Sequence, residues 1–253
     1  MPQRKTRAGA IRIGVGGWTY EPWRGVFYPQ NLPHSRELEF ASTHLNSIEV
    51  NGTYYGLQKP ATFSKWHEET PDDFIFSLKA PRFIMNRRVL ASAGEAMVRF
   101  LDSGLTRLKH KLGPINWQWL PTKAFDAADV EAFLKLLPKE KAGLPLRHAL
   151  EVRHESFRSE EFIQLARRYG AAIVISGDSP YPEIIEATAA FTYARIKGTR
   201  KNRKSGYSEA ALDSWAARAR EWSKTGEVFL YVIGGHKVSN PAAAVALIKR
   251  IAA

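Results

Sequence analysis

Residues 45–51, LNSIEVN, alternate between apolar and polar side chains, as a strand does when only one of its faces packs against helices. Ile48 and Val50 fall on one face. The other face takes the polar residues Ser47, Glu49 and Asn51. Because helices cover the outside of a parallel barrel, the apolar face is predicted to point outward and the polar face into the barrel.

Seven further segments have the character of strands, and helical patterns separate most of them. The eight predicted strands cover residues 11–17, 45–51, 74–80, 113–119, 147–153, 171–177, 191–197 and 228–234. Helices are predicted to begin near Ser35, Pro60, Asp126, Ser159, Ser208 and Ser239. Eight such units in 253 residues indicate an α/β fold, the (β/α)8 TIM barrel, whereas a doubly wound open sheet more often has about five or six strands.

Residues 178–190 depart from this alternation. They contain Pro180 and Pro182 and leave no room for a full crossover helix, so an abbreviated connection is predicted between the sixth and seventh strands. No linker or fixed-period repeat divides the chain. A single domain is therefore predicted over residues 11–253, after a basic tail over residues 1–10, MPQRKTRAGA.

Polar side chains point inward from several other strands, always toward the carboxyl end. The alternation places them at Lys79, Asn116, Gln118, Glu151, Arg153, Arg195 and Lys197. Aromatic residues follow the first two strands, at Trp18, Tyr20, Tyr54 and Tyr55. Barrel enzymes carry their active sites at the carboxyl ends of the strands, so a charged floor with an aromatic rim is predicted there.

Composition limits the kinds of partner. Lysine and arginine number 37 against 25 aspartates and glutamates, a net charge of +12, which favours an anionic small molecule or a nucleic acid. The chain has no cysteine, which removes disulfides and thiolate metal sites. No apolar run has the length of a membrane span, so a soluble, cytoplasmic protein without membrane contact is expected. Protein partners are left open.

The longest motifs, GVGGWTYEPWRGVFYP from Gly14, HLNSIEVNGTYYG from His44, FSLKAPRFI from Phe76, LEVRHESF from Leu150 and YARIKG from Tyr193, occur in the order found in a known family. Together they resemble the domain of unknown function 72, or YecE-like, family, over residues 11–251. The resemblance implies a TIM barrel and no established reaction. The seventh-strand motif of that family usually reads Arg-Leu-His-Gly, and this chain has Lys197 in place of the histidine. Val232 and Gly234 stand where the family usually has an aromatic residue and an asparagine.

Four residues are candidates for catalysis. Glu49 and Glu151 could serve as acid and base, or be ion-paired to neighbouring cations as a polar plug. His154 is either a proton carrier or a hydrogen-bonded structural residue. Asp178 is either a carboxylate of the mouth or a turn residue before Pro180.

Cationic, amide and aromatic side chains of the mouth are the candidates for binding an anionic ligand. They are Lys79, Arg153, Arg195, Lys197, Asn51, Gln118, Trp18, Tyr20, Tyr54, Tyr55, Arg200 and Lys201. The last two belong to RIKGTRKNRK, residues 195–204, whose second half forms a loop where barrels often hold phosphate. No metal is expected, because inward cations oppose a divalent ion and the histidines show neither HxH nor HExxH spacing, and no cofactor is predicted.

Three functions agree with these features. The first is binding, with or without hydrolysis, of a phosphate-bearing ligand such as a nucleotide or nucleic acid at the barrel mouth. The second is a non-catalytic ligand sensor or scaffold. The third is a glycosidase-like hydrolase that uses the two glutamates, which requires their carboxyl groups to lie within about 10 Å of each other.

Overall fold

The computed structural model describes residues 9–253. Of the predicted basic tail, only Gly9 and Ala10 lie within the described residues. The backbone N–H of Gly9 donates to Ser223, and the carbonyl of Ala10 accepts from Val228. The described chain therefore joins the fold directly ahead of the first predicted strand.

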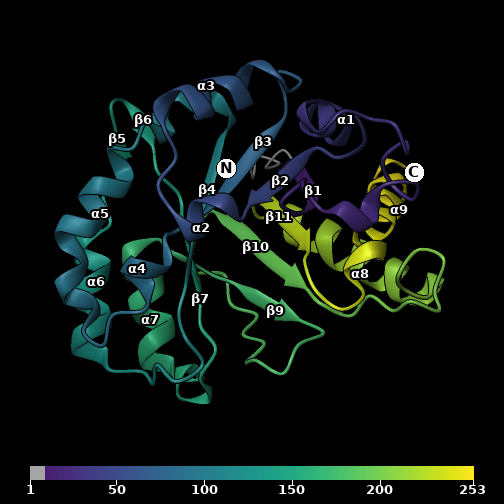
Figure 1. Cartoon of the computed structure of the whole chain (residues 1–253). Helices are drawn as coiled ribbons and strands as arrows, with labels where there is room; N and C mark the ends of the chain where they lie inside the picture. The colour runs from purple at the N-terminus through teal and green to yellow at the C-terminus, as the bar shows by residue number, and fades with distance from the viewer. Residues whose placement is uncertain (1–8) are drawn as a thin grey trace, which may run out of the picture.

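One parallel sheet forms a nearly closed barrel (Figure 1). Its strands are β1 (Ile11–Gly16), β2 (Ser47–Val50), β3 (Ile75–Lys79), β4 (Leu112–Gln118), β7 (His148–Glu151), β8 (Ala172–Ile173), β9 (Ile175–Gly177), β10 (Phe191–Ile196) and β11 (Glu227–Val232). Their order is β8-β7-β4-β3-β2-β1-β11-β10-β9. The TIM-barrel prediction is confirmed, with one difference in the strand count.

The difference lies in the sixth predicted strand, which is split into β8 and β9 on either side of Val174. β8 pairs with β7, and β9 pairs with β10. Residues 172–177 thus pair with β7 through their first half and with β10 through their second half. This segment therefore closes the barrel between β7 and β10. The sheet consequently has nine strand segments where the sequence predicts eight strands.

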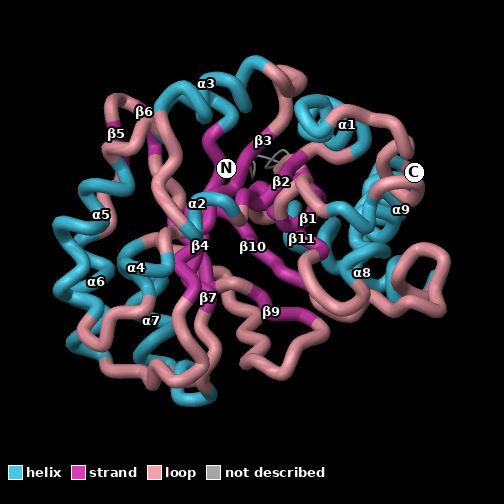
Figure 2. The backbone as a smooth tube through the Cα atoms, in the orientation of Figure 1, coloured by secondary structure: helices cyan, strands magenta, loops and turns pink. Residues whose placement is uncertain are grey.

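Helices surround the sheet on the outside (Figure 2). They are α1 (Glu37–His44), α2 (Gly52–Tyr55), α3 (Pro60–Glu68), α4 (Arg82–Met85), α5 (Gly94–Leu101), α6 (Ala127–Leu136), α7 (Glu160–Tyr169), α8 (Glu209–Ser223) and α9 (Asn240–Ala252). Asp126, Ser159 and Ser208 cap α6, α7 and α8, each accepting a hydrogen bond from the backbone of the first turn. No helix forms over residues 178–190, so the abbreviated connection between β9 and β10 is confirmed.

Two hydrophobic clusters lie on the two faces of the sheet. The outer cluster packs strand residues such as Ile48, Val50 and Leu78 against the helices. The inner cluster fills the barrel with Ile75, Ala149, Ala172, Val174, Phe191, Tyr193, Phe229 and Tyr231. Gly14 belongs to the inward phase, and a Cβ there would lie 1.8 Å from the Ser47 carbonyl oxygen. The inward glycine thus permits close packing of β1 and β2.

An antiparallel hairpin of β5 (Glu140–Lys141) and β6 (Leu144–Pro145) leads into β7 and was not predicted.

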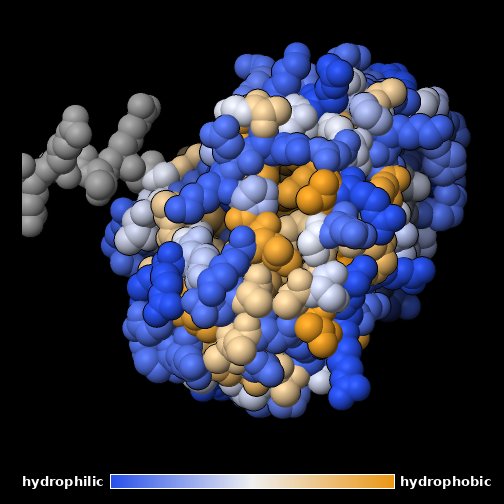
Figure 3. Space-filling view, turned by 90° about the vertical axis from the view of Figure 1, so that its left-hand side faces the viewer, coloured by the Kyte–Doolittle hydropathy of each residue, from blue (hydrophilic) through white to orange (hydrophobic). Residues whose placement is uncertain are grey.

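Figure 3 shows the side of the molecule that carries α5 and α6, where hydrophilic residues surround a band of apolar ones. Within residues 9–253, no helix is long and apolar enough to cross a membrane.

Candidate ligand-binding site

The floor of the barrel mouth is an ion-pair cluster around Arg195, which is 4% exposed. Its guanidinium donates to Glu49 Oε1 at 2.9 Å and also to Glu151 Oε2. Both glutamates are fully buried. Tyr193 donates to Glu49 Oε2 at 2.6 Å, and the Asn116 amide donates to both glutamates, at 3.2 and 3.3 Å. One arginine and one amide therefore join strands that are not neighbours in the sheet.

Further cations surround Glu151. Its Oε1 accepts from Arg153 at 2.9 Å and from Lys197 at 3.4 Å. Burial alone would raise the pKa of Glu151, but the charges of Arg195, Arg153, Lys197 and Lys79 outweigh it and hold this pKa well below its ordinary value. Glu151 is therefore a permanent anion at neutral pH and has no proton to donate to a substrate.

Lys79, at the end of β3, is a buried cation without an anionic partner. It is 7% exposed, and its amine lies 4.3 Å from the centre of the Tyr54 ring. Among residues 9–253 no carboxylate lies within 4.0 Å of that amine. Burial, with repulsion from Arg195, lowers the pKa of Lys79 from 10.5 to about 8, against the attraction of the two glutamates. An anionic ligand would supply the missing partner.

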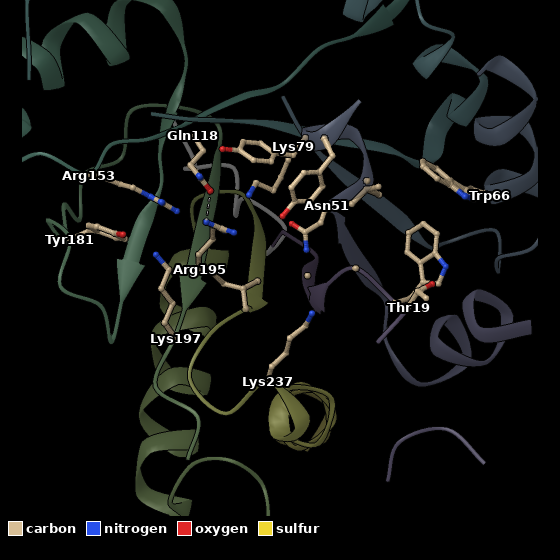
Figure 4. Close-up of a pocket in the computed structure, with 18 residues that line it drawn as sticks. Thr19, Asn51, Trp66, Lys79, Gln118, Arg153, Tyr181, Arg195, Lys197 and Lys237 are labelled. Atoms are coloured by element: carbon tan, nitrogen blue, oxygen red, sulfur yellow. Dashed lines mark hydrogen bonds between the residues drawn. The ribbon is translucent and has the colours of Figure 1, made fainter. Parts of the chain in front are cut away.

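Above the floor lies a cavity of about 730 Å³. Among residues 9–253, no carboxylate lines this cavity, and five cationic side chains do: Lys79, Arg153, Arg195, Lys197 and Lys237. In Figure 4 the charged ends of Arg153, Lys197 and Lys237 turn toward the same central space. The two glutamates lie beneath this wall, so the surface that a ligand would meet is positive.

Lys197 lies beside an aromatic ring that it shares with Arg153. Its amine lies 4.6 Å from the centre of the Tyr181 ring, and the Arg153 guanidinium lies at the same distance from that ring. Burial lowers the pKa of Lys197 to about 8, although Glu151 opposes the change. A Cβ at position 234 would lie 2.7 Å from the Lys197 Cβ, so Gly234 leaves the space through which this lysine passes.

Several other predicted binding residues lie at the same cavity. Its lining includes Asn51, Gln118, Trp18, Tyr54 and Tyr55. Tyr55 is 68% exposed and stands at the rim. Tyr20 does not line the cavity and lies under Lys237, whose amine is 3.9 Å from the ring centre.

The remaining predicted residues lie away from this cavity. His154 is partly exposed, and its Nδ1 accepts a hydrogen bond from the backbone N–H of Ser156, as an N-terminal cap does. Asp178 accepts hydrogen bonds from Tyr207 and Trp215. Arg200 lines a second cavity together with Asp178, and Lys201 is exposed on the loop above it. The structure therefore gives His154 a structural contact and places Asp178 at the second cavity.

Residues that were not predicted complete the site. Tyr193 has the inward phase of Arg195, and the same rule would have placed Tyr231 inside, where it shares hydrogen bonds with Ser47 and Ser77 at 2.6 and 2.7 Å. Tyr181 comes from a loop and Lys237 from a short 3-10 helix (Lys237–Ser239), and strand alternation indicates the position of neither. In the described part of the chain no three histidine, aspartate or glutamate side chains gather as metal ligands would.

These features define the class: a TIM-barrel-like α/β protein with a cationic cavity at the carboxyl ends of its strands. The family described as Protein of unknown function DUF72 matches residues 12–253, and the chain belongs to that family. A DUF72 family protein of Thermotoga maritima has a similar structure, with a TM-score of 0.77, 21% identity and coverage of 96% of this chain and 100% of the other. One from Enterococcus faecalis gives a TM-score of 0.74, 19% identity and coverage of 97% and 98%.

Two curated relatives are similar in sequence. The UPF0759 protein YecE of Escherichia coli is 31% identical over 151 residues, which cover 58% of this chain and 50% of YecE. The UPF0759 protein YunF of Bacillus subtilis is 26% identical over 159 residues, covering 61% and 54%. The alignments thus span about half the length of these relatives, and neither name states an activity.

Proposed function

We propose that the protein binds a phosphate-bearing small molecule in the cavity at the barrel mouth. The observation that carries this proposal is Lys79, a buried cation that opens into the cavity without a carboxylate partner. Burying an unpaired charge costs free energy, and a ligand anion would offset that cost through charge-assisted hydrogen bonds. The other cations of the wall add to the same positive field.

The aromatic side chains favour a nucleotide within this class. Trp18, Tyr54 and Tyr55 line the cavity, and flat rings can stack on a base. The cavity volume of about 730 Å³ lies within the range of about 300–1,000 Å³ common for small-molecule sites. A nucleoside monophosphate is therefore the first ligand to test.

Hydrolysis by two glutamates receives less support. Glu49 and Glu151 both accept from the Asn116 amide, so their carboxyl groups meet the distance requirement of a glycosidase. However, both are fully buried beneath the cations, and the low pKa of Glu151 excludes that residue as the general acid. The glutamates fit better as counter-charges that hold Arg195 in place.

The test is calorimetric titration with inorganic phosphate and with adenosine 5′-monophosphate at pH 7 and low salt. We expect both to bind, and we expect Lys79→Met to weaken binding about tenfold or more, the value of one charge-assisted hydrogen bond. Lys249→Met, on the exposed part of α9, is the matched control and should leave the Kd unchanged. Absence of binding to the wild-type protein, or equal losses in both variants, would remove the proposal and favour a scaffold role.

A further inference from the structure

A second cavity, of about 620 Å³, adjoins the first at the carboxyl ends of β9 and β10. Lys197 lines both cavities. The second is bordered by the loop after β10 and by the first turn of α8, and its cations are Lys197, Arg200 and Arg203. Within the part of the chain that the structure describes, Asp178 is the one acidic residue in this lining, so the wall is positive on balance.

The Asp178 carboxylate already accepts hydrogen bonds from two neighbouring side chains. Its Oδ2 accepts from Tyr207 at 2.8 Å and from the Trp215 indole at 3.1 Å. Tyr207 in turn accepts from the backbone N–H of Gly198 at 2.7 Å. Arg200 and Arg203, by contrast, have no carboxylate within 4.0 Å among the residues that the structure describes. Two free guanidinium groups thus face a cavity whose acid is committed to structural hydrogen bonds.

The loop that carries these arginines is held at its base. Thr199 is 4% exposed, and its hydroxyl donates to the Gly234 carbonyl at 2.6 Å. Within the loop, Arg200 donates its backbone N–H to Gly206 at 2.7 Å, and Gly206 donates to Arg203 at 2.9 Å. The backbone of the loop is therefore a hydrogen-bonded turn, from which the exposed side chains of Arg200 and Arg203 border the second cavity.

We infer that the ligand carries two separate phosphoryl groups, one in each cavity, on the two sides of Lys197. This inference rests on the proposed function, because it takes the first cavity as the site of one phosphoryl group. The second group would meet Arg200 and Arg203 beside the first turn of α8. The expected class is a compact bisphosphate, such as a nucleoside bisphosphate.

The experiment compares adenosine 5′-monophosphate with adenosine 3′,5′-bisphosphate, which differ by one phosphoryl group. By calorimetry at pH 7 we expect the bisphosphate to bind about tenfold or more tightly, the gain from one or two charge-assisted hydrogen bonds. In a variant with Arg200→Gln and Arg203→Gln, the ratio of the two Kd values should fall toward one. In Lys79→Met both ligands should bind more weakly.

The matched control removes two charges nearby but outside both cavities. Lys204→Gln with Lys249→Gln fits this purpose, since the two residues line a different hollow beside α9. The ratio of Kd values should stay at its wild-type value in this variant. A ratio near one in the wild type, or equal loss in both double variants, would overturn the inference, while monophosphate binding that depends on Lys79 would still uphold the proposed function. Tighter binding of a ten-residue thymidine oligonucleotide than of the bisphosphate would also overturn it, in favour of a nucleic-acid strand.

Discussion

The lowered pKa values of Lys79 and Lys197 make ligand binding depend on pH in a calculable way. Both lysines have a pKa of about 8, so each is about nine-tenths protonated at pH 7 and about one-tenth protonated at pH 9. As the pH rises through 8, the amines lose the charge that an anion requires. We therefore expect the affinity for adenosine 5′-monophosphate to fall about tenfold for each lysine that contacts the ligand, and about a hundredfold for both.

The ligand phosphate, two buried tyrosines and Arg195 each keep one charge state between pH 7 and pH 9. The ligand phosphate loses its second proton near pH 6 and stays dianionic between pH 7 and 9. Burial raises the pKa of Tyr193 and Tyr231 above their ordinary value of 10, so neither gains charge in this window. Arg195 stays charged throughout, because the two glutamates raise its pKa against the effect of burial. Burial also lowers the pKa of Lys237, which lines the same cavity, so titration of a Lys237→Met variant is needed to separate its contribution from those of Lys79 and Lys197.

Calorimetric titration at intervals between pH 6.5 and 9.5 measures this effect, with circular dichroism to verify the fold at each pH. Lys79→Met should start from weaker binding and keep only the tenfold step that belongs to Lys197. A Kd that is the same at pH 7 and pH 9 would refute the assignment of both lysines to the ligand. A full hundredfold fall in Lys79→Met would refute it for Lys79.

Three substitutions test the ion-pair cluster around Arg195 and the two lysines above it. Arg195→Leu would remove the cation that pairs with both Glu49 and Glu151 and leave the two carboxylates buried near each other. The free energy of unfolding measured in urea should therefore fall by about 3–5 kcal/mol. Lys79→Met should raise it at pH 7, by at most about 3 kcal/mol, and this gain should shrink between pH 8 and 10 as the wild-type lysine becomes neutral. Gly234→Ala would place a Cβ 2.7 Å from the Lys197 Cβ and displace that side chain, and calorimetry should show about tenfold weaker monophosphate binding.

The strand phases could be predicted because alternation is a local property of the sequence. Ser47, Glu49 and Lys79 point inward for the same reason that Ile48 and Leu78 pack under helices. The split of the sixth strand could not be predicted in this way. Residues 171–177, AAIVISG, are buried on both faces, so their pattern carries no information on where one pairing ends and the next begins.

The partners within the ion-pair cluster could not be predicted from the sequence, for a different reason. Glu49, Glu151 and the inward cations all share one mouth, and alternation cannot say which oxygen meets which nitrogen. That Arg195 spans both glutamates while Lys79 is left without a carboxylate depends on the distances across the barrel. Tyr181 comes from a loop and Lys237 from a single 3-10 turn, neither of which has a periodic sequence pattern, so only the folded chain brings them to the cavity.

The split at Val174 also determines where this barrel is weakest. The ring closes through two residue pairs between β7 and β8 and three between β9 and β10, and residues 178–190, which follow, contain no helix. Segments with few contacts open first in the native state, so amides of residues 172–177 should exchange with solvent faster than those of β1 or β11. Tyr181 lies in that connection and borders the ligand cavity, so an occupied cavity should slow this exchange. Closure of the ring and occupancy of the cavity would then be one equilibrium, readable from the exchange rates of six residues.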